Sequence, residues 1–73
     1  MARLPLISGA DAVKAFRKAG WRIDRVRGSH VILLKAGRRA SLSVPQHREL
    51  APGTLRSLIR SAAMSVAEFA ALL

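Results

Sequence analysis

Apolar residues recur at helical spacing near the start of the chain. Ser8 stands where an N-cap is expected, and Asp11 follows three residues later, near the positive end of the predicted helix. Gly20 is expected to end this helix. The apolar positions that repeat every three residues are Val13, Phe16 and Ala19.

From Trp21 to Val44 the apolar period changes toward two, which is typical of β-strands. Gly28-Ser29 and Ala36-Gly37-Arg38-Arg39 are turn-like breaks that divide this stretch into three short segments. The pattern predicts three antiparallel strands connected in sequence order. If the second turn centres between Gly37 and Arg38, residues whose numbers sum to about 75 face each other.

This register assigns side chains to the two faces of the predicted sheet. One face is apolar and is expected to cover the core, and it carries Val26, Val31, Leu33, Leu42 and Val44. The other face points away from the core and carries Arg25, Arg27, His30, Ile32, Leu34, Ser41 and Ser43. In this register Arg27 lies opposite His30, and Arg25 lies opposite Ile32. A slip of one residue would exchange the two faces.

The last third of the chain predicts two more helices. Pro45 is expected to end the third strand, and Pro52 fits the first turn of a helix, where its missing N–H is not needed. That helix has an apolar stripe formed by Leu55, Leu58, Ile59 and Ala62. Ser65 and Glu68 have the spacing of a capping box that opens a short final helix. The expected fold is α+β: a single domain over residues 1–73, α-β-β-β-α(-α), with helices on one face of a three-stranded antiparallel sheet.

The charge balance predicts the kind of partner. The chain contains thirteen Lys and Arg residues but only four Asp and Glu residues, which gives a net charge of +9 in 73 residues. This charge favours a polyanion or an acidic protein as the binding partner. The four acids are scattered, and two-metal catalysis needs several carboxylates close together. Two histidines and no cysteine are too few for a zinc site. We therefore expect a site on the surface or in a shallow groove, with no metal and no cofactor.

The start of the chain does not predict membrane insertion. Met1 to Ile7 contains the short apolar run Leu4-Pro5-Leu6-Ile7, which is far shorter than a signal-peptide core or a membrane span. We therefore expect a cytoplasmic protein without a membrane partner.

His30 is the strongest candidate for chemistry. It follows Gly28-Ser29 at a predicted strand end, among arginines, and an imidazole can transfer a proton near neutral pH while arginines hold a phosphate. His47 is expected at the same end of the sheet, either to share acid and base roles or to steady the connector before Pro52. On the first helix, a basic stripe is either a phosphate contact or a solvated face. The stripe consists of Lys14, Arg17 and Lys18.

An ordered set of short motifs along the chain resembles the HicA (YcfA-like) family of toxins. The set runs Leu4-Pro5, Ser8-Gly9, Ala19-Gly20-Trp21, Gly28-Ser29-His30, Val44-Pro45-x-His47, Leu50-x-Pro52-Gly53-Thr54-Leu55-Arg56 and Ala63-Met64-Ser65. No single motif is specific, but the order and spacing cover nearly the whole chain. The chain departs from the family pattern at Ala10, where a lysine or another polar residue is common, and in its short second hairpin.

The resemblance implies a function and a partner. HicA toxins are ribosome-independent mRNA interferases of type II toxin-antitoxin systems, linked to stress response, with a fold like the double-stranded-RNA-binding domain. They are neutralised by HicB antitoxins encoded beside them. The catalytic residue of the family is the histidine of the Gly-Ser-His motif, which is His30 here. The implied partners are therefore single-stranded mRNA and a HicB-like antitoxin.

RNA carries its own nucleophile, so a histidine base can start cleavage without a metal. If His30 takes the proton of a 2′-OH, that oxygen can attack the adjacent phosphorus, leaving a 2′,3′-cyclic phosphate and a 5′-OH. Arg25 and Arg27 are candidates to stabilise the pentavalent phosphorane, or else they form a solubilising strand edge. Lys14, Arg17, Lys18 and His47 complete the predicted RNA-binding set.

Other residues and functions complete the predictions. Ile32 and Leu34 are expected to form an exposed apolar patch that joins His30 in the antitoxin interface. Trp21 is expected to pack in the core rather than stack on a base. Two alternative functions remain open: a non-catalytic RNA-binding module that uses the same basic face, and a protein-interaction domain whose basic face fits an acidic partner.

Overall fold

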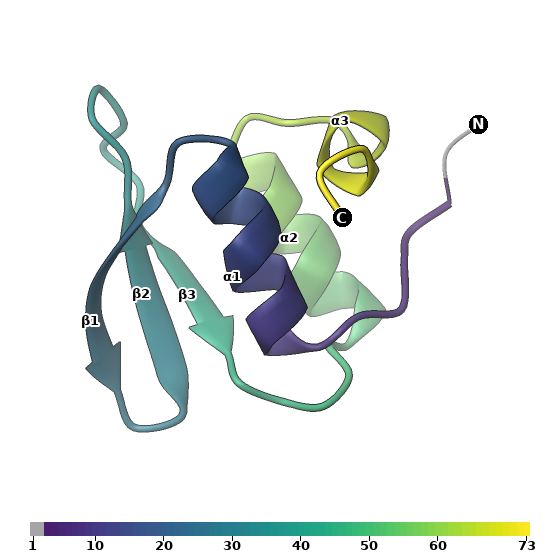
Figure 1. Ribbon diagram of the computed structural model, residues 1–73, viewed down its shortest axis with the longest axis horizontal. Coiled ribbons are helices and arrows are strands. Elements are labelled where there is room, and N and C mark those ends of the chain that lie inside the picture. Colours follow the sequence, from purple (N-terminus) through teal and green to yellow (C-terminus); the bar gives the residue numbers. More distant parts are fainter. Residues whose placement is uncertain (1–2) are drawn as a thin grey trace.

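The structure, a computed structural model, describes residues 3–73 and has the predicted α+β order (Figure 1). The elements are α1 (Gly9–Lys18), β1 (Arg22–Arg27), β2 (His30–Leu34), β3 (Leu42–Pro45), α2 (Pro52–Ser61) and α3 (Val66–Ala70). The strands form one antiparallel sheet in the order β1-β2-β3. Figure 1 shows α1 and α2 on the same side of the sheet, with α3 beyond them. Residues 1 and 2, which belong to the predicted domain and to the N-terminal segment from Met1 to Ile7, lie outside the described residues.

The residues that were predicted to begin or end helices are confirmed in these positions. The Ser8 hydroxyl accepts a hydrogen bond from the Asp11 N–H at 3.1 Å and caps α1. Gly20 follows the end of α1 with φ +100°, a left-handed conformation that glycine adopts without strain. Pro52 is the first residue of α2, and Ser65 and Glu68 form a complete capping box at α3. These end signals are local, which explains why they could be predicted from the sequence.

The predicted register is confirmed between β2 and β3. Val31 pairs with Val44 and Leu33 with Leu42, and all four side chains are buried. Between β1 and β2, Arg27 pairs with His30 as expected, but the register shifts between Ile23 and Arg25. Asp24 is the extra residue of this bulge. The shift puts Arg22, which pairs with Leu34, on the same face as Arg25 and Arg27.

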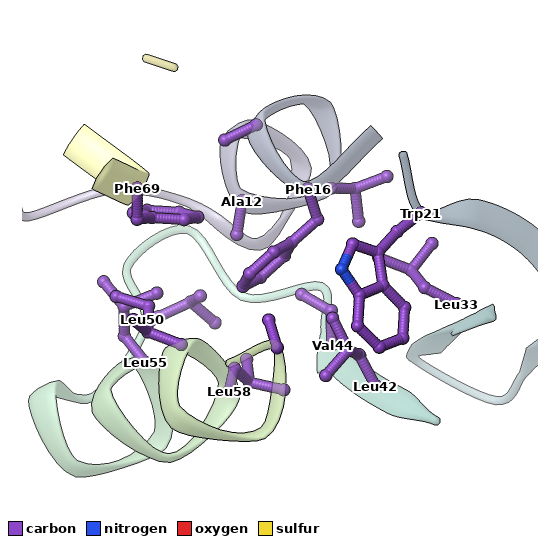
Figure 2. Close-up of a cluster of buried hydrophobic side chains, with 14 of the residues drawn as sticks. Ala12, Phe16, Trp21, Leu33, Leu42, Val44, Leu50, Leu55, Leu58 and Phe69 are labelled. Carbon is purple, nitrogen blue, oxygen red and sulfur yellow. The ribbon is translucent and has the colours of Figure 1, made fainter. Parts of the chain in front are cut away.

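The core lies between the sheet and the helices (Figure 2). The rings of Phe16 and Phe69 pack with centroids 4.8 Å apart, which ties α3 to α1. Trp21 is 2 % exposed, so the predicted packing role is confirmed, although its indole Nε1 has no hydrogen-bond partner within residues 3–73. The largest fully buried side chains are Phe16, Phe69, Leu33, Leu42, Leu55 and Val44.

Two expectations about exposure were wrong. Ile32 is only 8 % exposed, although it lies on the face away from the helices, and Leu34 is half-buried. Ile32 belongs to the central strand, where Arg25 and Ser43 flank it from both neighbouring strands. Conversely, Val26 shares the face of Val31 but is 65 % exposed, because the helices lie on the β3 side of the sheet and β1 is the strand farthest from them (Figure 1). Ile32 and Leu34 therefore do not form the exposed patch that the sequence predicted.

Gly9 fixes how α1 meets the end of β3. Its N–H donates to the carbonyl oxygen of His47 at 2.9 Å. A Cβ at this position would overlap the carbonyl oxygen of Pro45 and lie 3.0 Å from the Cα of Gln46. Only glycine allows the helix to approach so closely without a shift of the backbone.

Candidate functional site

The turn between β1 and β2 places His30 at the end of the sheet. Gly28 has φ +59°, which lets the chain reverse over Gly28 and Ser29. His30 is therefore the first residue of β2, and its side chain is exposed on the face away from the helices. Its Nδ1 lies 3.0 Å from the Oγ of Ser43 on β3. His30 is thus held by a neighbouring strand while its ring remains accessible to solvent.

Backbone hydrogen bonds hold the connector after β3 against this hairpin. The Gln46 N–H donates to the Ser29 carbonyl oxygen at 2.7 Å, and the next residue, His47, accepts from Gly9. The expectation that His47 follows the strand toward the His30 end is therefore confirmed for the backbone. The His47 side chain is exposed. Its proposed share in acid–base chemistry stays a prediction.

Arg27 and Arg25 lie on the same face as His30 but in different surroundings. Arg27 is directly cross-strand from His30 and exposed, and it forms no salt bridge within residues 3–73. The Arg25 Nη1 instead lies 2.5 Å from the Asp24 Oδ2, and the two side chains are 53 % and 35 % exposed. Such an exposed ion pair is worth only about 0–1 kcal/mol, so a phosphate can compete for Arg25. Arg27 is the more readily available cation beside the imidazole.

Three features of this face were not found from the sequence. The Asp24–Arg25 pair was missed because adjacent strand residues normally point to opposite faces, and the bulge removes that separation. Arg22 was missed for the same reason. Ser43 was placed on the correct face, but its contact with His30 runs diagonally, since its direct cross-strand partner is Ile32.

The basic stripe on α1 does not join His30. Lys14 and Lys18 line a cleft of about 290 Å³ between α1 and the C-terminal residues, together with Asp11. The Lys18 Nζ donates to the Leu72 carbonyl oxygen at 3.0 Å. Because α1 covers the face of the sheet opposite to His30, these lysines lie on the other side of the sheet from the imidazole. Arg17 belongs to the same helix surface, in a shallow depression that it shares with both lysines.

Metal-ligating side chains do not gather at this site. Within residues 3–73, no three His, Cys, Asp or Glu side chains lie close enough together to hold a metal ion. None of the helices in the described part of the chain has the length and apolar character needed to cross a bilayer. The groups that can act at the sheet end are therefore an accessible imidazole, a hydroxyl in contact with it and exposed guanidinium groups.

These features define a class: a small, strongly basic α+β protein that presents an imidazole and arginines on the open face of a three-stranded sheet. The family model described as the HicA toxin of bacterial toxin-antitoxin systems matches residues 9–64, which is more than half of the chain and includes His30, and the chain belongs to this family. A comparison with curated proteins found no match.

Family membership supports two general conclusions about this chain. HicA toxins are in general ribonuclease toxins, which supports a nuclease activity for this chain. A toxin of this kind also has an antitoxin as its partner. The resemblance seen in the sequence is thereby confirmed at the level of the family.

Proposed function

We propose that this protein is a metal-independent endoribonuclease that cleaves single-stranded mRNA in the cytoplasm, with His30 as its general base. The observation that carries the proposal is an exposed imidazole directly cross-strand from an exposed arginine, Arg27, which forms no salt bridge among residues 3–73, in a chain of the HicA family. An open sheet face suits a substrate whose bases and phosphates are accessible, as they are in single-stranded RNA.

The proposed reaction needs no external nucleophile. The neutral imidazole of His30 takes the proton of a ribose 2′-OH, and the 2′-oxygen forms a bond to the adjacent phosphorus. The bond from phosphorus to the 5′-oxygen then breaks, and this oxygen leaves with a proton supplied by water or by the imidazolium. The products are a 2′,3′-cyclic phosphate and a 5′-OH. A positioned base contributes about 10²–10⁴-fold to such a reaction.

The arginines have separate roles in this proposal. Arg27, beside His30, stabilises the negative charge of the pentavalent phosphorane. Arg25 holds a neighbouring phosphate once it is released from Asp24. Because Lys14, Arg17 and Lys18 lie across the sheet from the imidazole, we assign them to long-range attraction of RNA rather than to the scissile phosphate.

The antitoxin partner is proposed to be HicB-like and to inhibit by covering His30. An acidic surface that pairs with Arg25 and Arg27 would exclude RNA from the same face. The buried Ile32 contributes little to such an interface. Charge reversal of both arginines to glutamate should then weaken the complex, whereas a complex that leaves His30 accessible would contradict this mode of inhibition.

The decisive experiment compares wild type, His30→Ala and His47→Ala on a defined single-stranded RNA in EDTA. His47→Ala tests the second histidine, because His47 is also exposed near the same end of the sheet, and a smaller loss of activity than in His30→Ala is expected if His30 is the base. We expect wild type to leave a 2′,3′-cyclic phosphate, identified by mass spectrometry, and His30→Ala to lose at least 10²-fold in rate. Circular dichroism checks that all three proteins fold.

The pH profile and RNA binding test the base and the class of function. Cleavage should fall at acid pH, because a protonated imidazole cannot accept the 2′-OH proton. A profile without an acid limb would contradict the base role. Salt-sensitive RNA binding by wild type and His30→Ala alike, with cleavage by neither, would identify a non-catalytic RNA-binding module instead.

A further inference from the structure

We propose that Ser43 is a positioning residue that fixes the ring and the tautomer of His30. The inference rests on the proposed function, because it concerns how the base is prepared for catalysis. Its starting observation is the 3.0 Å contact between the His30 Nδ1 and the Ser43 Oγ. Ser43 has no place in the proton transfer itself, since its oxygen contacts the ring nitrogen that we assign away from the RNA.

The position of the Ser43 hydroxyl is set by the sheet. Val44 and Leu42, on either side of Ser43, are fully buried and pair with Val31 and Leu33. These two pairs fix the β3 backbone, so Ser43 must point to the opposite face, toward the side chain of His30. The strand ladder therefore holds the hydroxyl in place although the residue itself is exposed.

The chemistry decides the direction of the hydrogen bond. A neutral imidazole carries its hydrogen on one nitrogen, and the nitrogen without hydrogen is the base. If the Nδ1–H donates to the Ser43 oxygen, Nε2 keeps its lone pair and can accept the 2′-OH proton. If the Ser43 hydroxyl donates to Nδ1 instead, the hydrogen lies on Nε2, and the ring cannot act as a base there.

A hydrogen bond from the His30 Nδ1–H to the Ser43 oxygen is also retained throughout the reaction. Once Nε2 takes a proton, both ring nitrogens carry hydrogen, and Nδ1–H still donates to the Ser43 oxygen. The opposite arrangement would have to break its hydrogen bond as the imidazolium forms. A Ser43 oxygen that accepts throughout therefore stabilises both the free base and its protonated product.

The closing experiment uses four variants. Ser43→Ala removes the hydroxyl, while Ser43→Thr and Ser43→Val form a pair of nearly equal shape in which only threonine keeps it. Ser41→Ala is the matched control, because Ser41 lies two residues earlier on the same exposed face and its side chain makes no hydrogen bond within residues 3–73. The exposed position of Ser43 limits effects on folding, and thermal unfolding of each variant verifies this.

Imidazole ¹⁵N chemical shifts of His30 are the first readout and require no RNA. In the neutral ring of wild type and Ser43→Thr we expect the hydrogen on Nδ1, and in Ser43→Ala and Ser43→Val we expect exchange between tautomers. Wild-type spectra with the hydrogen mainly on Nε2 would overturn the inference. So would spectra that are the same in all variants.

Cleavage kinetics are the second readout. Loss of the hydroxyl should lower kcat about 10-fold, the effect of a hydrogen bond of about 1.4 kcal/mol, with RNA affinity unchanged. Ser43→Thr should keep wild-type kcat, and Ser41→Ala should do the same. Equal kcat for Ser43→Val and Ser43→Thr would refute the positioning role. If wild type does not cleave RNA at all, the proposed function fails, while the ¹⁵N shifts still decide whether Ser43 sets the tautomer.

Discussion

Replacing Gly9 by alanine tests whether the close approach of α1 to the end of β3 holds the fold together. The added Cβ would overlap the Pro45 carbonyl oxygen, a backbone atom at the end of the sheet. Relief requires α1 to move away, and that movement would lengthen the hydrogen bond from the Gly9 N–H to His47.

The magnitude follows from three contributions. Overpacking costs about 1–3 kcal/mol, and a weakened hydrogen bond costs up to about 1 kcal/mol more. Alanine recovers about 0.4–1 kcal/mol, because it restricts the unfolded chain. Together these contributions lower the free energy of unfolding by about 0–3.6 kcal/mol. The middle of this range, about 2 kcal/mol, corresponds to a decrease in Tm of about 8–16 °C for a domain of this size.

Gly53→Ala is the matched control for this substitution. Gly53 also lies in the first turn of a helix, α2, but a Cβ there would meet no atom within 4 Å. We expect its Tm to rise by about 2–8 °C, from a gain of about 0.4–1 kcal/mol. Thermal unfolding followed by circular dichroism measures both variants. If Gly9→Ala is as stable as Gly53→Ala, the inferred close contact is wrong.

Three further predictions concern charge. Arg27→Gln should lower the slope of log Kd for RNA against log salt by about 0.7, which is the contribution of one phosphate on a single strand, whereas Arg56→Gln on the exposed side of α2 should leave the slope unchanged. Asp24→Asn should strengthen RNA binding by freeing Arg25, and unchanged affinity in a filter-binding assay would argue against a role of Arg25 in holding RNA. At α3, hydrogen bonds from the N-cap backbone N–H and hydroxyl hold the pKa of Glu68 below its ordinary value. The ionised Glu68 carboxylate therefore stabilises the fold fully above about pH 4.3, the ordinary pKa of glutamate. This stabilisation is lost as the pH falls through the lower pKa that Glu68 has in the folded protein. Urea unfolding of wild type and Glu68→Gln should converge at low pH, and a difference that persists there would contradict this assignment.

The local features of the fold could be predicted because short-range chemistry determines them. Ser8, Gly20 and Pro52 each mark a helix end through their own backbone or side-chain properties. The β2–β3 register followed from alternating apolar residues on both sides of one turn, since only one pairing buries all of them. The position of His30 beside Arg27 followed from the same reasoning at the first turn.

The features that could not be predicted depend on properties that alternation does not encode. The bulge at Asp24 inserts one residue into β1, and no turn or glycine in the sequence marks it. Burial of Ile32 reflects its place on the central strand, between Arg25 and Ser43, and exposure of Val26 reflects the distance of β1 from the helices, which lie on the β3 side of the sheet. The contact between His30 and Ser43 needed coordinates, because a diagonal pair can be in or out of reach at the same register.

The loop between β2 and β3 is a suitable place to attach a label or tag for experiments in living cells or with immobilised protein. It follows Leu34, whereas His30 begins the same strand, so the two are separated by about 13 Å of extended chain. Gly37 in this loop has open space around it, and no residue from Ala36 to Ser41 belongs to the buried core. A fluorescent label or affinity tag inserted there would leave both the strand ladder and the imidazole untouched. The molecule therefore has an attachment point, at the opposite end of β2 from His30, through which it can be followed or immobilised.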